Sequence, residues 1–121
     1  MKYLFGIAAA MTALLSIVWL AIPARMLEQW GMRADPAAIY MSRRYGAGFV
    51  GYALILWLAR AAGPSPARTA ILAGGAAVTG VFAIVSLAGV LTGVAGPFAW
   101  SAFVIEAALA AGFGYYLATG R

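Results

Sequence analysis

Four long apolar stretches make up most of this chain, and they constrain its fold more than any other feature. They cover about residues 3–22, 36–61, 68–91 and 97–118. About 20 apolar residues are enough for an α-helix to cross the hydrocarbon core of a bilayer. A chain of 121 residues that is 65% hydrophobic has more apolar surface than a water-soluble core of this size can bury. The sequence therefore predicts an all-α integral membrane four-helix bundle, with residues 1–121 as a single transmembrane domain.

The beginning of the first stretch resembles a signal peptide, because Met1 and Lys2 precede an apolar run. The hydrophobic core of a signal peptide is usually only about 7–15 residues long, and a cleavage site of small residues follows it. This run is longer and ends at Pro23. We therefore expect a first spanning helix rather than a cleaved signal.

The segment from Pro23 to Gly31 has two different faces at helical spacing. Apolar residues fall on one face and polar residues on the other: Met26, Leu27 and Trp30 against Arg25, Glu28 and Gln29. This pattern predicts a short amphipathic helix in the membrane interface between the first two spans. An irregular surface loop is the alternative interpretation.

Two arginines, Arg43 and Arg44, lie two turns inside the second apolar stretch, whose start is marked by Asp35 and Pro36. With a rise of ~1.5 Å per residue, they lie roughly 10–12 Å below the outer end of their helix, and Glu106 lies roughly 13 Å below its own. An unpaired charge at this depth costs about 3 kcal/mol or more. We therefore predict that Glu106 pairs with Arg43, with Arg44 or with both.

Such a pair has two interpretations. It can fix the register of a bundle that hydrophobicity alone does not specify, or it can form a site for a polar headgroup or a proton relay, with Tyr40 on the same helical face as Arg44. A third arrangement has no pair: both arginines extend to the outer interface, and Glu106 bonds a hydroxyl such as that of Ser42 or Tyr40.

Small residues recur on three of the four predicted spans. Such residues let neighbouring helices pack closely within a membrane. The candidates for helix packing are Gly46, Gly48 and Gly51 in the second span, Ala76 and Gly80 in the third, and Ala108 and Gly112 in the fourth. The pattern leaves open whether the partner helix belongs to this chain or to another.

The residue types that most often carry chemistry are scarce. The chain has no cysteine and no histidine, which removes thiolate nucleophiles, the commonest general base and the commonest metal ligand. We therefore predict no catalytic residue, no metal site, no cofactor and no enzymatic activity. The hydroxyls inside the spans are expected to bond their own helices: Thr12, Ser16, Thr79, Ser86 and Ser101.

The net charge of +5 indicates orientation and contact with anionic lipid rather than nucleic-acid binding. The two ends of the predicted bundle carry four basic residues against two: Lys2, Arg60, Arg68 and Arg121 against Arg25 and Arg33. This excess predicts that both termini are cytoplasmic. The bias disappears if Arg43 and Arg44 are counted with the second group.

Several short motifs together resemble a known group of proteins. A first span ends at Ile22 and Pro23, an arginine precedes the run 45–48 (Tyr-Gly-Ala-Gly), and a glycine-rich third span precedes a fourth that carries Glu106. The chain thereby resembles small four-helix bacterial membrane proteins of unknown function in the DoxX/DoxD-like superfamily. That resemblance implies a bacterial inner membrane location and an accessory subunit of a redox or quinone-linked complex.

Two functions are therefore expected. The first is a non-catalytic accessory or stabilising subunit that binds other membrane subunits. The alternative is a binder or carrier of a small hydrophobic or amphipathic molecule, such as a quinone, a lipid or a pigment. The Arg43, Arg44 and Glu106 cluster would then hold the polar end of that ligand.

Overall fold

A computed structural model describes all 121 residues and contains five helices and no strand. The helices are α1 (Lys2–Ala21), α2 (Pro23–Gln29), α3 (Pro36–Ala59), α4 (Pro66–Leu91) and α5 (Ala99–Thr119). The prediction of an all-helical fold is confirmed. The segment after Pro23 is helical, as the amphipathic pattern predicted, and Leu27 is buried while Arg25 and Glu28 are exposed.

Local capping explains where the long helices begin. The Asp35 side chain accepts a hydrogen bond of 2.8 Å from the Ala38 amide at the start of α3. Helix α4 begins at Pro66, two residues before the predicted start, because Ser65 caps it and Pro66 fits its first position. Helix α5 begins at Ala99, two residues after the predicted start, because a turn still occupies residues 97–98.

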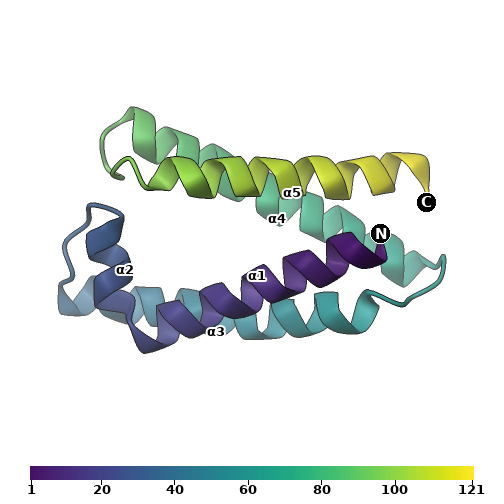
Figure 1. Cartoon of the computed structure of the whole chain (residues 1–121), viewed down its shortest axis with the longest axis horizontal. Helices are drawn as coiled ribbons and strands as arrows, with labels where there is room; N and C mark the ends of the chain where they lie inside the picture. Colours follow the sequence, from purple (N-terminus) through teal and green to yellow (C-terminus); the bar gives the residue numbers. More distant parts are fainter.

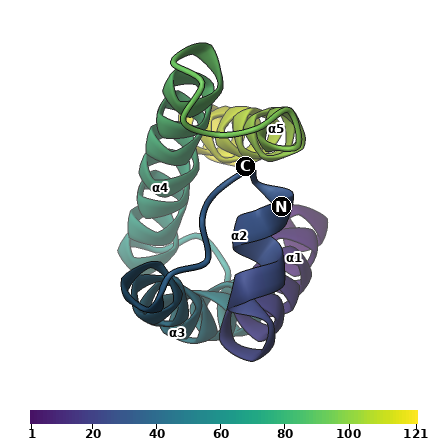
Figure 2. The ribbon, with the colours of Figure 1, turned by 90° about the vertical axis from the view of Figure 1, so that its left-hand side faces the viewer.

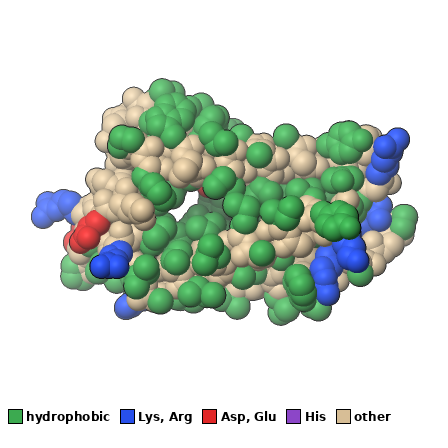
Figure 3. All heavy atoms as spheres, viewed as in Figure 1, with side chains coloured by type: hydrophobic (Ala, Val, Ile, Leu, Met, Phe, Trp, Pro, Cys, Tyr) green, Lys and Arg blue, Asp and Glu red, His purple; other side chains and the backbone are tan.

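Three of the helices, α1, α4 and α5, are long and apolar enough to cross a membrane. They identify the chain as a membrane protein. Helix α3 is not among the three, and its interior carries the two charges of Arg43 and Arg44. A bundle of four spans is therefore not established. Figure 3 shows the basic side chains gathered at the two ends of the molecule, with an apolar band between them.

The long helices form two antiparallel hairpins rather than one evenly packed bundle. Helix α1 packs along α3, and α4 packs along α5 (Figure 1). The contacts between the two hairpins are few, and Figure 2 shows α1 beside α3 and α5 beside α4 in a view along the molecule. Both termini and the connection 60–65 lie at one end of the molecule, whereas α2 and the connection 92–98 lie at the other (Figure 1).

The end that holds the termini, which we call the closed end, contains the main hydrophobic core. Phe5 of α1, Leu56 of α3 and Phe113 of α5 have no exposed surface there. The rings of Phe5 and Phe113 lie 6.0 Å apart and join the two hairpins. A Cβ atom added at Gly75 of α4 would lie 2.9 Å from the Phe113 ring, so glycine is required for this close packing.

The opposite end, which we call the open end, is bridged by loops instead of a core. The Gly96 amide, between α4 and α5, donates a 2.7 Å hydrogen bond to the Trp30 carbonyl that follows α2. Gly31 adopts a φ of +75°, a conformation that favours glycine, and lies against Gly96. This backbone contact and the ring contact of Trp30 with Phe98 join the two hairpins at the open end. Further along, Phe82 of α4 meets Tyr45 and Phe49 of α3, with ring centroids 5.7 and 5.9 Å apart.

Candidate functional site

A cavity of about 230 Å³ lies between the two hairpins at the open end. Figure 3 shows an opening between the two layers of helices in this part of the molecule. Ten of its twelve lining residues are hydrophobic, and they come from α1, α2, α3, α5 and the two loops of the open end. The lining residues are Met11, Leu14, Leu15, Trp19, Met26, Trp30, Tyr45, Phe98, Ser101, Ala102, Ile105 and Glu106.

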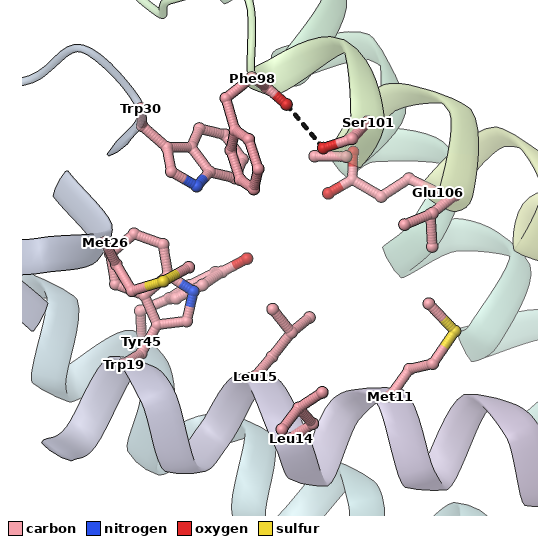
Figure 4. A pocket seen from close by; sticks show the side chains of 12 residues that line it. Met11, Leu14, Leu15, Trp19, Met26, Trp30, Tyr45, Phe98, Ser101 and Glu106 are labelled. Atoms are coloured by element: carbon pink, nitrogen blue, oxygen red, sulfur yellow. Dashed lines mark hydrogen bonds between the residues drawn. The ribbon is translucent and has the colours of Figure 1, made fainter. Parts of the chain in front are cut away.

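Aromatic rings form one wall of this cavity. Trp19 packs on Trp30 with the ring centroids 6.2 Å apart, and on Tyr45 with the centroids 5.6 Å apart. Phe98, at the start of α5, meets Trp30 at 6.3 Å. Figure 4 shows these side chains facing Glu106 across the cavity. Each ring of the wall contacts at least one other ring from a different element.

Glu106 is the one acidic residue of the cavity wall. It lies seven residues inside α5, which places it roughly 10 Å along the helix from Ala99. Its carboxylate accepts a 2.7 Å hydrogen bond from the Ser86 hydroxyl of α4, and its side chain points into the cavity (Figure 4). Ser86 therefore holds the carboxylate in place from the neighbouring helix of the same hairpin.

The predicted ion pair is wrong, because Glu106 meets neither Arg43 nor Arg44. The backbones of helices α3 and α5 come nowhere within 8 Å of each other, measured between Cα atoms, and the carboxylate is bonded by Ser86 instead. Helix α3 turns Tyr45 toward the cavity, which leaves both arginines exposed on its outer surface. There the long side chains can reach the membrane interface, as the third arrangement proposed.

The other residues of that prediction also lie outside the cavity. Tyr40 is 60% exposed, and its ring centroid lies 6.0 Å from the Arg44 guanidinium carbon. The Ser42 hydroxyl donates to the Ala38 carbonyl of its own helix. Neither hydroxyl bonds Glu106. The expected bonding of hydroxyls to their own helices holds for Thr12, Thr79 and Ser101, but it is wrong for Ser86.

Two buried polar atoms have no hydrogen-bond partner in the chain, and both belong to cavity walls. One is the indole N–H of Trp30, which lines the main cavity. The other is the hydroxyl of Tyr52, which lines a second cavity of about 50 Å³. Glu106 and Tyr45 line both cavities, so the two spaces adjoin. Buried polar groups are rarely left unpaired in folded proteins, so these two atoms set the walls of the cavities apart from an ordinary core.

The small residues singled out for packing fall into two groups. Some meet another helix: an added Cβ at Gly46 would lie 3.0 Å from Trp19, one at Gly112 would lie 3.0 Å from Leu4, and Ala76 packs against the core. The others have open space or are exposed: Gly48, Gly51, Gly80 and Ala108.

Most of the cavity wall was missed by sequence reasoning. The sequence pattern predicted ordinary interfacial or core positions for the aromatic residues, among them Trp30, Tyr45 and Phe98. Spacing along one helix does not reveal which rings meet across the fold. One contact could have been found. Ser86 and Glu106 lie ten residues on either side of Gly96, and an antiparallel hairpin centred on that turn brings them to the same level.

Comparisons of the chain with protein-family models, with curated proteins and with solved structures give no match. The resemblance to the DoxX/DoxD-like superfamily therefore rests on the sequence motifs alone. The candidate site has to be interpreted from its own chemistry: an apolar cavity, an aromatic wall, one carboxylate and unpaired polar atoms.

Proposed function

We propose that this protein binds a small amphipathic molecule in the cavity between its two hairpins, with Glu106 at the polar end of the ligand. The observation that carries the proposal is the meeting of an apolar cavity with a carboxylate inside the span. Binding sites for small molecules are mostly apolar hollows with a few convergent polar groups. A cavity of roughly 150 Å³ holds benzene, so one of about 230 Å³ can hold a ring with a short substituent.

The membrane gives such a ligand a way in. The opening lies between the helical layers in the view of Figure 3, across the direction of the helices. With α1, α4 and α5 crossing the bilayer, this side of the molecule faces lipid. A ligand that dissolves in the bilayer would then enter sideways, without passing through the polar end of the molecule.

The arrangement in the bilayer is part of the proposal. Helix α3 packs along α1 (Figure 1), so a membrane that surrounds α1 surrounds α3 as well. This supports α3 as the fourth span. Both termini and the connection 60–65 share one end, which supports a bacterial inner membrane topology with that basic end in the cytoplasm.

Native mass spectrometry of the chain, purified in a mild detergent, tests this function. We expect a retained small molecule in the wild-type chain. The variant Ala102→Phe, which fills the cavity, should lose it, whereas Ala108→Phe, on the exposed surface of the same helix, should keep it. Equal small-molecule content in all three proteins, or none in any, would contradict the proposal.

A second candidate is an accessory subunit of a larger, redox or quinone-linked membrane complex. It is favoured by Gly48 and Gly51, which are exposed on α3 with open space where a side chain would be. Small residues of this kind let another helix approach closely. The same purification should then retain other polypeptides, and Gly48→Leu with Gly51→Leu should release them. Val50→Leu, on the same helix, is the matched control.

A further inference from the structure

We infer that the ligand of the cavity is a small hydrophobic organic cation, such as an aromatic amine or a quaternary ammonium compound. This inference rests on the proposed function and specifies its ligand class. It follows from the charge of the one ionisable acid in the cavity, from the rings that face it, and from the places where the basic side chains of the chain lie.

The carboxylate of Glu106 has no cationic partner within the chain. Its one side-chain hydrogen bond comes from the neutral Ser86 hydroxyl, which leaves most of its acceptor sites free. No lysine or arginine lines either cavity, and Arg43 and Arg44 lie outside, on the exposed surface of α3. Glu106 is half-buried, and a carboxylate without a counter-charge is costly at membrane depth. A cationic ligand would supply that missing charge.

The wall opposite Glu106 suits a cation as well. Aromatic faces attract ammonium groups within about 6 Å of the ring centroid, and tryptophan and tyrosine rings do so most strongly. Trp19, Trp30 and Tyr45 are joined by ring contacts of 5.6 to 6.2 Å, and all three line the cavity. A cation placed between this wall and Glu106 is attracted from both sides. An anion is repelled by the carboxylate and meets no basic group.

The apolar lining of the cavity determines the chemistry of the uncharged part of the ligand. Met11, Leu14, Leu15 and Ile105 surround the remaining space and offer only hydrocarbon and thioether contacts. The ligand therefore combines one positive charge with a compact apolar body that can partition into the bilayer.

A matched pair of probes isolates the charge. Benzyltrimethylammonium and neopentylbenzene have the same shape, and differ in having a cationic nitrogen or a neutral carbon at one position. Their binding can be followed as displacement of bromobenzene, which quenches tryptophan fluorescence. The protein carries Trp57→Phe and Trp100→Phe, so that Trp19 and Trp30 report on the cavity. Nanodiscs of zwitterionic lipid avoid attraction of the cation to the membrane surface.

The expected result is that the cation displaces bromobenzene at a concentration at least about tenfold lower than its neutral isostere does. In Glu106→Gln this preference should fall to about threefold or less, while neopentylbenzene binds as before. Glu106→Asp keeps the charge and should keep the preference. Binding of neopentylbenzene by each variant also shows that its cavity is folded.

Each other result has a defined meaning. If both probes displace bromobenzene equally, the cavity binds ligands but the cationic class is wrong. If the preference survives in Glu106→Gln, the carboxylate is not its source and the inference fails. If bromobenzene itself shows no saturable binding to the wild-type chain, both the inference and the proposed function are overturned.

Discussion

The closed and open ends of this molecule hold the same two hairpins together in different ways. At the closed end, Phe5, Leu56 and Phe113 are fully buried, and Gly75 lets the helices of the second hairpin touch. At the open end, a backbone hydrogen bond between Gly96 and Trp30 and the ring contact of Trp30 with Phe98 join the hairpins, and the helices behind enclose a cavity. Packing at one end therefore leaves room at the other for a cavity with a carboxylate in its wall.

The division also separates stability from binding. Membrane helices gain little from hydrophobicity when they associate, so close packing has to stabilise the fold. That packing is concentrated around Phe5, Leu56 and Phe113. The carboxylate of Glu106 lies apart from this core, in the wall of the cavity. Substitutions at the two ends should therefore have different consequences.

The largest effect is expected at the centre of the closed end. Phe113→Ala removes a fully buried ring and should lower the free energy of unfolding by about 3 kcal/mol or more. Phe98→Ala, at the open end, removes a ring that is 41% exposed and should cost clearly less. Thermal unfolding of both variants in one detergent compares them directly. Equal losses would mean that the two ends are packed alike.

The next largest loss of stability is expected at Gly75, the glycine that packs against the Phe113 ring. Gly75→Ala places a methyl group against a buried ring and should destabilise the fold by about 1–3 kcal/mol. Gly74→Ala is the matched control, since an added Cβ at that neighbouring position meets nothing within 4 Å. Because alanine favours helices, this control should be neutral or slightly stabilising. A control that unfolds as early as Gly75→Ala would refute the role of close packing.

A smaller effect is expected for the hydrogen bond between Ser86 and Glu106. A double-mutant cycle with Ser86→Ala and Glu106→Met, which has no oxygen acceptor, should give a coupling near the average of about 0.6 kcal/mol for polar contacts between membrane helices, and at most about 1.7 kcal/mol. The cycle of Arg44→Gln with Glu106→Gln should give no coupling, since the two residues lie apart. Coupling of Glu106 to Arg44 instead of Ser86 would restore the ion pair that the structure lacks.

The smallest effect on stability is expected for Trp30→Phe. This variant keeps a ring next to Trp19 and Phe98 but removes an N–H that has no partner in the chain. Its unfolding temperature should hardly change, because no hydrogen bond is lost. A clear drop in the unfolding temperature would show that the N–H is bonded within the fold.

The sequence predicted the elements of this fold well and their contacts poorly. Runs of apolar residues and caps such as Asp35 and Pro36 are local signals, so the helices lie close to where they were expected. The pairing of Glu106 depended on matching depths along two helices. Depth does not determine rotation about the helix axis, and the rotation of α3 turned Tyr45 inward and the arginines outward. The cavity itself arises from helices that diverge, which no local pattern reports.

Fluorescence quenching by bromobenzene tests the central claim, that the open end contains a ligand site. The protein carries Trp57→Phe and Trp100→Phe, so that its two remaining tryptophans, Trp19 and Trp30, both lie in the cavity wall. It is embedded in nanodiscs of zwitterionic lipid. We predict quenching that saturates in the parent chain and in Ala108→Phe but is lost in Ala102→Phe, where the added ring fills the cavity. Quenching that rises linearly and equally in all three proteins would show only partition into lipid, and would contradict the claim.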